Sequence, residues 1–304
     1  MGKVRNYLSL IKFSHTIFAM PFALIGFFLG MFDYTSVNPD WHTGFFTGLY
    51  NWNLLLVKFI LVILCMVFAR SAAMSFNRYL DREFDAKNPR TAIREIPAGI
   101  LGANNVLLFT VANCVLFIAC CFFINRLCFL LSPVALLIIL GYSYTKRFTV
   151  LCHLVLGLGL SLAPIGAYLA VTAKFDLVPV LFSLAVLSWV SGFDIIYALQ
   201  DDEFDRAEKL FSIPASFGRS KALSVSEFLH LVSGVFVIFA GLYGSFGWLY
   251  WLGVAVFLGM LFYQHIIVKP DDLRKVNLAF MTANGIASIV FAVFVIADLF
   301  INNH

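Results

Sequence analysis

Acidic side chains gather in two short stretches of the chain, and the two stretches resemble each other. Asp-x-Glu-Phe-Asp occupies residues 81–85 and occurs again at 201–205. Ile-Pro-Ala follows each copy, at 96–98 and at 213–215. Similar motifs repeated along one chain are typical of membrane proteins built from two related halves. The pattern therefore predicts an internal repeat with one acidic motif in each half.

The spacing of the acidic residues allows them to share a helix face. Asn77, Asp81 and Asp85 are four residues apart, and Asp201 and Asp205 have the same spacing. On a helix such residues lie one turn apart on the same side. Stacked carboxylates repel one another unless a cation lies between them, and oxygen ligands without Cys or His favour Mg²⁺. Because Mg²⁺ usually binds one or two carboxylates together with phosphate oxygens, the pattern predicts a magnesium–diphosphate site.

Basic residues near these motifs could bind the diphosphate. Arg90 and Arg94 follow the first motif and lie one turn apart if their loop is helical, and Lys146 ends a later apolar run. One guanidinium group can donate two parallel hydrogen bonds to phosphate oxygens, and lysine attracts them as a point charge. A solvated acidic helix end is the alternative interpretation of one cluster. It does not explain two matching clusters that both have Arg or Lys beside them.

Two further charged residues lie within apolar stretches. Arg70 lies seven residues, or two turns, before Asn77 and deeper in the membrane, where an isolated arginine costs at least about 2.5–3.5 kcal/mol on insertion scales. It should therefore pair with an acid or an anionic ligand, and Asp194 is one candidate partner. Asp194 lies two turns before Asp201, near the predicted site. A purely structural ion pair is the alternative interpretation of Arg70.

The helices that position these residues must lie in a membrane. Of the 304 residues, 61% are hydrophobic and 12% are charged, whereas a soluble domain is roughly 25% charged. No soluble globule of this length could bury so large an apolar fraction, so a soluble enzyme and a disordered regulator are excluded. The net charge of +4 is too small to indicate a nucleic-acid binder. The six cysteines lie in or next to apolar runs, which favours buried free thiols over disulfides or metal ligands.

Apolar runs of about 20 residues are long enough to cross a bilayer, and runs without alternation indicate helices rather than a barrel. We expect an all-α integral membrane protein, with one domain over residues 1–304 and nine transmembrane helices around a central cavity. The predicted spans cover residues 15–32, 53–76, 103–123, 127–145, 149–172, 178–199, 222–243, 247–268 and 277–300.

The distribution of basic residues predicts the orientation. With a cytoplasmic N-terminus, the cytoplasmic segments hold 17 of the 21 Lys and Arg residues, beginning with Lys3, Arg5 and Lys12. The opposite side holds three, and Arg70 lies within a span. An excess of positive charge on the cytoplasmic side is the general rule for membrane proteins. Both acidic motifs are then expected to face the cytoplasm.

These residues resemble the UbiA-type intramembrane aromatic prenyltransferases. The first signature covers residues 77–99 and the second covers 194–218, while Tyr-Ser-Tyr-Thr-Lys-Arg at 142–147 matches a shorter element. With the nine spans, the resemblance extends over essentially the whole chain. The Asn-Pro-Arg-Thr-Ala and Tyr-Ala-x-Gln-Asp runs are similar to the 4-hydroxybenzoate polyprenyltransferase branch. Arg78, where that branch often has an acid, and Glu95-Ile96, where Pro-Leu is commoner, depart from it.

The resemblance implies Mg²⁺-dependent transfer of a polyprenyl group from its diphosphate to an aromatic ring carbon in quinone biosynthesis. The acceptor is 4-hydroxybenzoate, or alternatively a dihydroxynaphthoate of the menaquinone pathway. The implied setting is a bacterial cytoplasmic (inner) membrane, with membrane lipid around the chain and the active site facing the cytoplasm. A secondary transporter and a membrane scaffold are the alternatives from other classes. A transporter would place its charges near the midplane, and a scaffold leaves the paired Asp motifs unexplained.

Each candidate residue receives a role from this resemblance. Magnesium, expected as two ions bridged by the diphosphate, would be bound by Asn77, Asp81, Asp85, Asp201 and Asp205. The four aspartates of that set, together with Asp194 as a proton acceptor or acceptor-orienting group, are the candidate catalytic residues. Other substrate contacts are expected from Arg90, Arg94 and Lys146 to the diphosphate, from Arg70 to the acceptor's carboxylate, and from Tyr142 and Tyr197 to the allylic cation.

Overall fold

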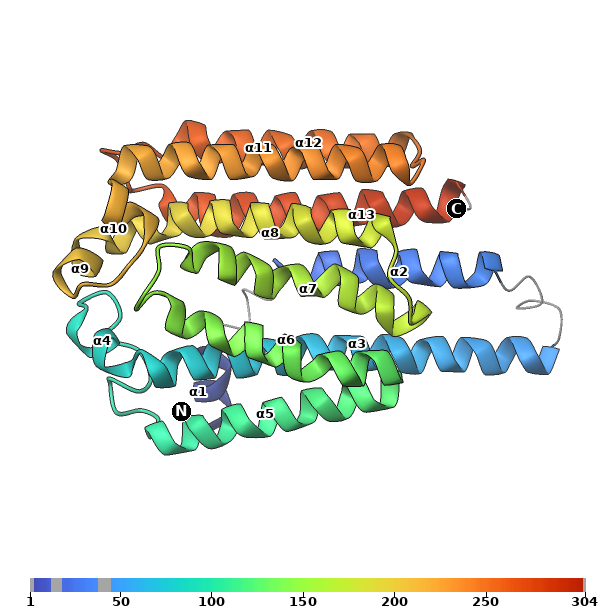
Figure 1. The fold of residues 1–304 in the computed structure, drawn as a ribbon, viewed down its shortest axis with the longest axis horizontal. Coiled ribbons are helices and arrows are strands. Elements are labelled where there is room, and N and C mark those ends of the chain that lie inside the picture. The colour runs from blue at the N-terminus through green and yellow to red at the C-terminus, as the bar shows by residue number, and fades with distance from the viewer. Residues whose placement is uncertain (1–2, 12–17, 38–44, 303–304) are drawn as a thin grey trace.

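The computed structural model describes residues 3–11, 18–37 and 45–302, which are helical apart from short connections. Figure 1 shows the long helices running side by side along one axis. The helices are α1 (Lys3–Leu10), α2 (Met20–Val37), α3 (Phe45–Leu80), α4 (Arg82–Lys87), α5 (Ala103–Ile124), α6 (Arg126–Thr145), α7 (Cys152–Thr172), α8 (Leu177–Ala198), η3 (Leu199–Asp201), α9 (Asp202–Ala207), α10 (Ile213–Phe217), α11 (Arg219–Tyr243), α12 (Trp248–Ile267), η4 (Leu278–Ala283) and α13 (Asn284–Asn302).

Eight helices within the described residues are long and apolar enough to cross a membrane, and each overlaps a predicted span. The all-helical membrane fold is therefore confirmed. The first predicted span corresponds to α2, whose apolar part, Met20–Tyr34, is shorter than these eight. Residues 15–17 of that span, and Lys12 of the basic N-terminal segment, lie outside the described residues. The count of nine spans, the orientation and the internal repeat stay predictions.

Polar side chains define several helix ends. The Asn125 side chain accepts a hydrogen bond from Cys128 N at 2.8 Å and so caps α6. Its Nδ2 donates to Leu169 O of α7 at 2.8 Å. Such caps satisfy N–H groups that a helix cannot bond internally. A single asparagine therefore ends the turn between α5 and α6 and also joins it to α7.

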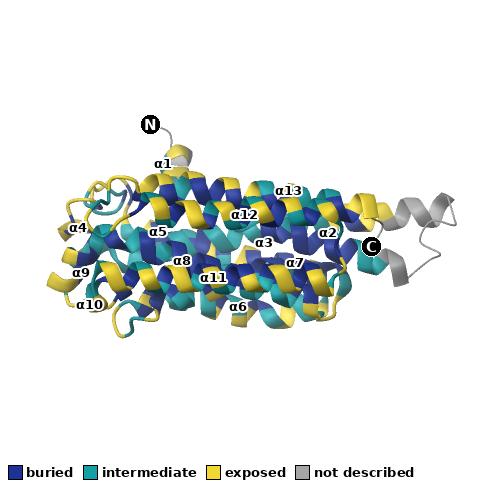
Figure 2. Cartoon of the chain, turned by 90° about the horizontal axis from the view of Figure 1, so that it is seen from above, coloured by how far each residue is buried: buried dark blue, intermediate teal, exposed yellow. Residues whose placement is uncertain are grey.

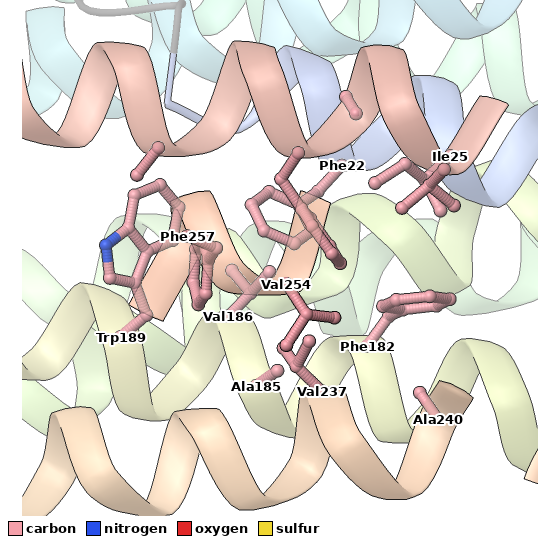
Figure 3. Packing of buried hydrophobic residues seen from close by; sticks show 14 of the residues in the cluster. Phe22, Ile25, Phe182, Ala185, Val186, Trp189, Val237, Ala240, Val254 and Phe257 are labelled. Atoms are coloured by element: carbon pink, nitrogen blue, oxygen red, sulfur yellow. The ribbon is translucent and has the colours of Figure 1, made fainter. Parts of the chain in front are cut away.

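The largest hydrophobic core lies among α2, α8, α11, α12 and α13, and Figure 3 shows its centre. Trp189 of α8, Phe22 of α2 and Phe257 of α12 are fully buried. The Trp189 ring centroid lies 5.3 Å from that of Phe22 and 5.7 Å from that of Phe257. The indole N–H donates to Asn284 Oδ1 at 2.8 Å, so the buried donor is satisfied. This packing joins α8 to α2, α12 and α13.

The outer faces of the bundle are apolar, and Figure 2 shows exposed residues along the outside of the helices. Leu108, Phe123, Leu137 and Phe262 are each more than two-thirds exposed. Large apolar side chains in such numbers on helix surfaces are typical of contact with lipid. The helices thus bury one face against each other and present the other to the bilayer.

The short helices α4, α9 and α10 gather at one end of the bundle. α4 continues from α3, while η3 and α9 continue from α8, and Figure 1 shows α4, α9 and α10 together at that end. α3 continues four residues past its predicted end, to Leu80. Asn77 is therefore helical, and the first acidic motif begins where α3 ends.

Close packing of α2 on α7 generates a stability prediction. A Cβ added at Gly26 would lie 2.0 Å from Pro164 O, whereas one added at Gly141 of α6 would meet no atom within 4 Å. Overpacking typically costs about 1–3 kcal/mol. We expect Gly26→Ala to lower the thermal unfolding temperature in detergent, and Gly141→Ala to leave it unchanged or raise it. Equal temperatures for the two variants would contradict the α2–α7 contact.

Candidate active site

A polar cavity of about 200 Å³ lies where α3, α6 and α8 end. It is lined by every predicted site residue except Arg70. These are Asn77, Asp81, Asp85, Arg90, Arg94, Tyr142, Lys146, Asp194, Tyr197, Asp201 and Asp205. The two acidic motifs are more than 110 residues apart in the sequence and share one cavity. The structure thus brings together the groups that the spacing singled out, while their individual roles stay predictions.

The first motif keeps its helical spacing across a break between helices. Asp81 N donates to Asn77 O at 2.9 Å and Asp85 N donates to Asp81 O at 2.7 Å, so the backbone stays nearly helical from α3 into α4. Asn77 Nδ2 also donates to Asp81 Oδ2 at 3.0 Å. Burial raises the pKa of Asp81 above its ordinary value, and the neighbouring charge of Asp85 raises it further. The three side chains therefore line one face, as predicted.

Asp85 lies between two guanidinium groups. Arg94 Nη1 lies 2.5 Å from Asp85 Oδ1, and Arg78 Nη1 lies 4.0 Å from Asp85 Oδ2. Arg78 was not among the predicted site residues, although it is 5% exposed and lines the cavity. Residues 88–101 form turns rather than a helix, so Arg90 and Arg94 are not one helical turn apart. Instead they reach different acidic residues.

Asp201 of the second motif is bound by side chains from the loop that follows the first motif. Arg90 Nε donates to Asp201 Oδ1 at 2.9 Å, and Arg90 Nη2 contacts Asp201 Oδ2. Arg90 Nη1 also donates to the Tyr197 hydroxyl at 3.0 Å. Asn88 Nδ2 donates to Asp201 Oδ1 at 3.1 Å, and Asn88 Oδ1 accepts from Arg90 N at 3.0 Å. These contacts fasten the loop after α4 to the end of α8.

Asp205 is fully buried and faces a lysine from a third segment. Lys146 Nζ lies 2.7 Å from Asp205 Oδ1, and Ser212 Oγ donates to Asp205 Oδ2 at 2.9 Å. Burial lowers the pKa of Lys146, but the adjacent Asp205 carboxylate outweighs that effect, so this pKa lies above its ordinary value. Lys146 therefore carries its charge inside the cavity. Arg147, its neighbour, contacts Asp81 Oδ1 at 3.4 Å.

The structure does not pair Arg70 with Asp194, which was one candidate partner for it. Asp194 Oδ2 lies 2.7 Å from His153 Nδ1 of α7, so a histidine occupies the position expected for the arginine. Arg70 Nε is buried and has no hydrogen-bond partner among the described residues. His153 was missed because a lone histidine in an apolar run gives no spacing signal.

Arg70 instead lines a second, apolar cavity of about 360 Å³ between α3, α5, α6 and α7. Tyr142 lines both cavities. Cys65, Cys121 and Cys128 also line the apolar cavity, and all six cysteines are free thiols, as predicted. The polar and apolar cavities therefore meet at Tyr142, with Arg70 on the apolar side.

The oxygen atoms that line the polar cavity are compatible with a magnesium site, provided that a bound ligand supplies further oxygens. Its carboxylate and amide oxygens are the hard ligands that Mg²⁺ prefers, and Asp85 Oδ2 has no hydrogen-bond partner among the described residues. Among the residues that the structure describes, no three His, Cys, Asp or Glu side chains are grouped closely enough to hold a metal ion by themselves. These residues thus fit a magnesium ion that takes further oxygens from a bound ligand.

A profile of the UbiA prenyltransferase family matches residues 23–286, which is most of the chain. The chain belongs to the UbiA prenyltransferase family. This membership confirms the resemblance seen in the sequence and makes the chain an enzyme that transfers prenyl groups. The transporter and scaffold alternatives are therefore set aside.

Similar proteins include 4-hydroxybenzoate octaprenyltransferases. The protein from Aliivibrio salmonicida is 31% identical over 251 residues, which are 80% of this chain and 84% of the relative. The protein from Nitrosospira multiformis is 28% identical over 233 residues, which are 77% of this chain and 80% of the relative. The family similarity therefore extends over most of both chains.

Solved structures share the fold. The apo structure of a UbiA homolog from Aeropyrum pernix has a TM-score of 0.75 at 27% identity and covers 95% of this chain and 98% of its own. A UbiA homolog from Archaeoglobus fulgidus bound to DMAPP and Mg²⁺ has a TM-score of 0.70 at 19% identity, covering 97% of this chain and 99% of its own. The helical arrangement described above is thus that of the family.

The contacts of Asn88 generate a prediction about the loop after α4. Without its side chain, the loop loses a partly buried hydrogen bond to Asp201 and the hydrogen bond that Asn88 Oδ1 accepts from Arg90 N. We expect Asn88→Ala to increase tryptic cleavage after Arg90 and Arg94, measured by peptide mass. Glu208→Ala is the matched control, because it breaks only the exposed Lys87–Glu208 pair, and such pairs contribute little. Unchanged cleavage in Asn88→Ala would mean that Asn88 does not hold the loop.

Proposed function

We propose that this UbiA-family enzyme transfers a polyprenyl group from polyprenyl diphosphate to a ring carbon of 4-hydroxybenzoate in quinone biosynthesis. One observation carries the proposal: two acidic motifs and their basic partners line a single polar cavity that meets an apolar cavity at Tyr142. A substrate with a diphosphate head and a hydrocarbon tail has the same two parts. The 4-hydroxybenzoate octaprenyltransferases among the relatives support the choice of acceptor.

The polar cavity would hold the diphosphate together with magnesium, and we expect two ions. The magnesium ligands proposed are Asn77, Asp81, Asp85, Asp201 and Asp205. When bound, the metal supplies positive charge that stabilises the diphosphate as a leaving group. The Archaeoglobus fulgidus homologs bound to Mg²⁺ with DMAPP or GPP support this assignment.

The basic residues of the cavity would act on the same leaving group. Arg90, Arg94 and Lys146 each pair with a motif aspartate, so their charges are already in position. On substrate binding they would contact diphosphate oxygens, whose negative charge increases as the allylic C–O bond breaks. Charges that are fixed before the reaction stabilise such a transition state without reorganisation.

The apolar cavity would hold the start of the prenyl chain and keep water away from the allylic carbon. Its walls between α3 and α7 are almost entirely hydrocarbon and thiol groups. Tyr142 lies where the allylic carbon would be, and Tyr197 lines the polar side. Aromatic faces stabilise cations. Excluding water prevents hydrolysis of the reactive intermediate.

Arg70 would bind the acceptor's carboxylate. Its buried Nε has no partner among the described residues, and a guanidinium binds a carboxylate through two parallel hydrogen bonds. Asp194 on the polar side would then meet the opposite end of the aromatic ring. The excess of basic residues on one side supports a site that faces the cytoplasm of a bacterial inner membrane.

The metal assignment predicts that transfer requires both aspartate motifs and a divalent cation. We expect Asp81→Ala or Asp201→Ala to lower the rate of transfer at least about 100-fold, because a ligand of the leaving-group site is lost. Asp272→Ala is the control, since Asp272 lies outside both cavities and pairs with Arg274. A chelator should abolish transfer by the purified enzyme, and added Mg²⁺ should restore it. Turnover retained in chelator or in either motif variant would reject the assignment.

The acceptor is tested by the mass of the product. Membranes containing the enzyme are given polyprenyl diphosphate with 4-hydroxybenzoate or with a dihydroxynaphthoate, and we expect the prenylated 4-hydroxybenzoate. Arg70→Ala should raise KM for the aromatic acid at least about tenfold, because a charged hydrogen bond contributes about 1.5–3 kcal/mol. KM for the diphosphate should not change. Product from the dihydroxynaphthoate alone would assign the enzyme to the menaquinone pathway, and the reverse KM pattern would move Arg70 to the diphosphate site.

A further inference from the structure

His153 of α7 is a buried residue of the polar cavity to which no role has been assigned. It is 2% exposed and lines the cavity beside Asp194. Its Nδ1 lies 2.7 Å from Asp194 Oδ2, and its Nε2 accepts a hydrogen bond from the backbone N–H of Ile213 at 3.3 Å. Both ring nitrogens are therefore in contact with the second signature, one near each end of it.

These two contacts determine which nitrogen carries the proton. A backbone N–H can only donate, so Nε2 must be the acceptor of a neutral imidazole. The proton of the ring is then on Nδ1, as assigned from this hydrogen-bond network. Nδ1–H donates to Asp194 Oδ2 and so fixes the orientation of the carboxylate. Asp194 Oδ1 makes no hydrogen bond to the described residues, and the side chain is 23% exposed and lines the cavity.

The same segment that binds His153 also holds Asp205. Ser212 Oγ donates to Asp205 Oδ2 at 2.9 Å, and Ile213, the next residue, donates to His153. Phe211 N donates to Lys146 O at 2.7 Å. Residues 211–213 therefore connect the proposed metal ligand to the His153–Asp194 pair. These contacts fix the position of Asp194 relative to the proposed diphosphate site.

We infer that His153 is a positioning residue that orients Asp194 and directs its Oδ1 at the aromatic acceptor, where it receives the proton released on substitution. The inference rests on the proposed function. In that reaction the C1–O bond of the prenyl diphosphate breaks, and its electron pair leaves with the diphosphate. A ring carbon bonds to C1, and the electron pair of its C–H bond restores the aromatic ring. The proton passes to Asp194 Oδ1.

Three substitutions of His153 distinguish a role in orienting Asp194 from a role in filling space. The amide nitrogen of Asn reaches the place of Nδ1, whereas that of Gln reaches the place of Nε2. His153→Asn therefore keeps a donor to Asp194, His153→Gln keeps a polar side chain of similar volume without that donor, and His153→Leu keeps only volume. Each full-length variant is purified in detergent, its thermal unfolding is recorded, and kcat and both KM values are measured with 4-hydroxybenzoate.

We expect His153→Gln and His153→Leu to lower kcat at least about tenfold, in the range found when a residue that orients a functional group is removed. His153→Asn should stay within about threefold of the unsubstituted enzyme, and KM for the diphosphate should change in none of them. If His153→Leu does not fold, the contrast between Asn and Gln decides. Equal kcat for Asn and Gln would overturn the inference. Absence of transfer by the unsubstituted enzyme would instead overturn the proposed function.

Discussion

Carboxylates buried at the edge of a membrane need compensating positive charge, and this requirement organises one end of the protein. Asp205 is fully buried against Lys146, and Asp201 is held by Arg90. Each cation comes from a segment far in sequence from its acid, so the ion pairs also join the loop after α4 and the end of α6 to the end of α8. Removing one partner of a buried pair leaves an uncompensated charge, which costs far more than losing a surface pair.

The charges of the polar cavity balance in number. Five aspartates face five basic side chains, which are Arg78, Arg90, Arg94, Lys146 and Arg147. Such a cavity favours a ligand that brings both signs of charge, since a bare anion or a bare cation would leave part of the lining unpaired. A diphosphate with magnesium meets this condition. When a basic side chain binds the diphosphate, the aspartate that was paired with it can bind the metal instead. The ion pairs described here thus place the groups that the proposed reaction needs.

The sequence predicted the parts of this site that follow from local rules. Helical spacing alone places Asn77, Asp81 and Asp85 on one face, and apolar run length locates eight of the long helices. Pairing between distant segments follows from packing rather than spacing. His153 in an apolar run therefore gave no signal, and the sequence did not show that Asn88 contacts Asp201 or that Arg70 and Asp194 line different cavities. Asp194 was singled out because it lies two turns before Asp201, but its neighbour His153 was not.

The position of Tyr142 between the two cavities bears on how products would separate. In the proposed reaction, one product is a small, highly charged ion and the other is a long hydrocarbon with an aromatic end. The ion would leave from the polar cavity toward water, and the hydrocarbon product from the apolar cavity toward the acyl chains. Each product would then leave from its own side, and neither would obstruct the release of the other. Partitioning between water and lipid then makes recombination improbable without any moving gate.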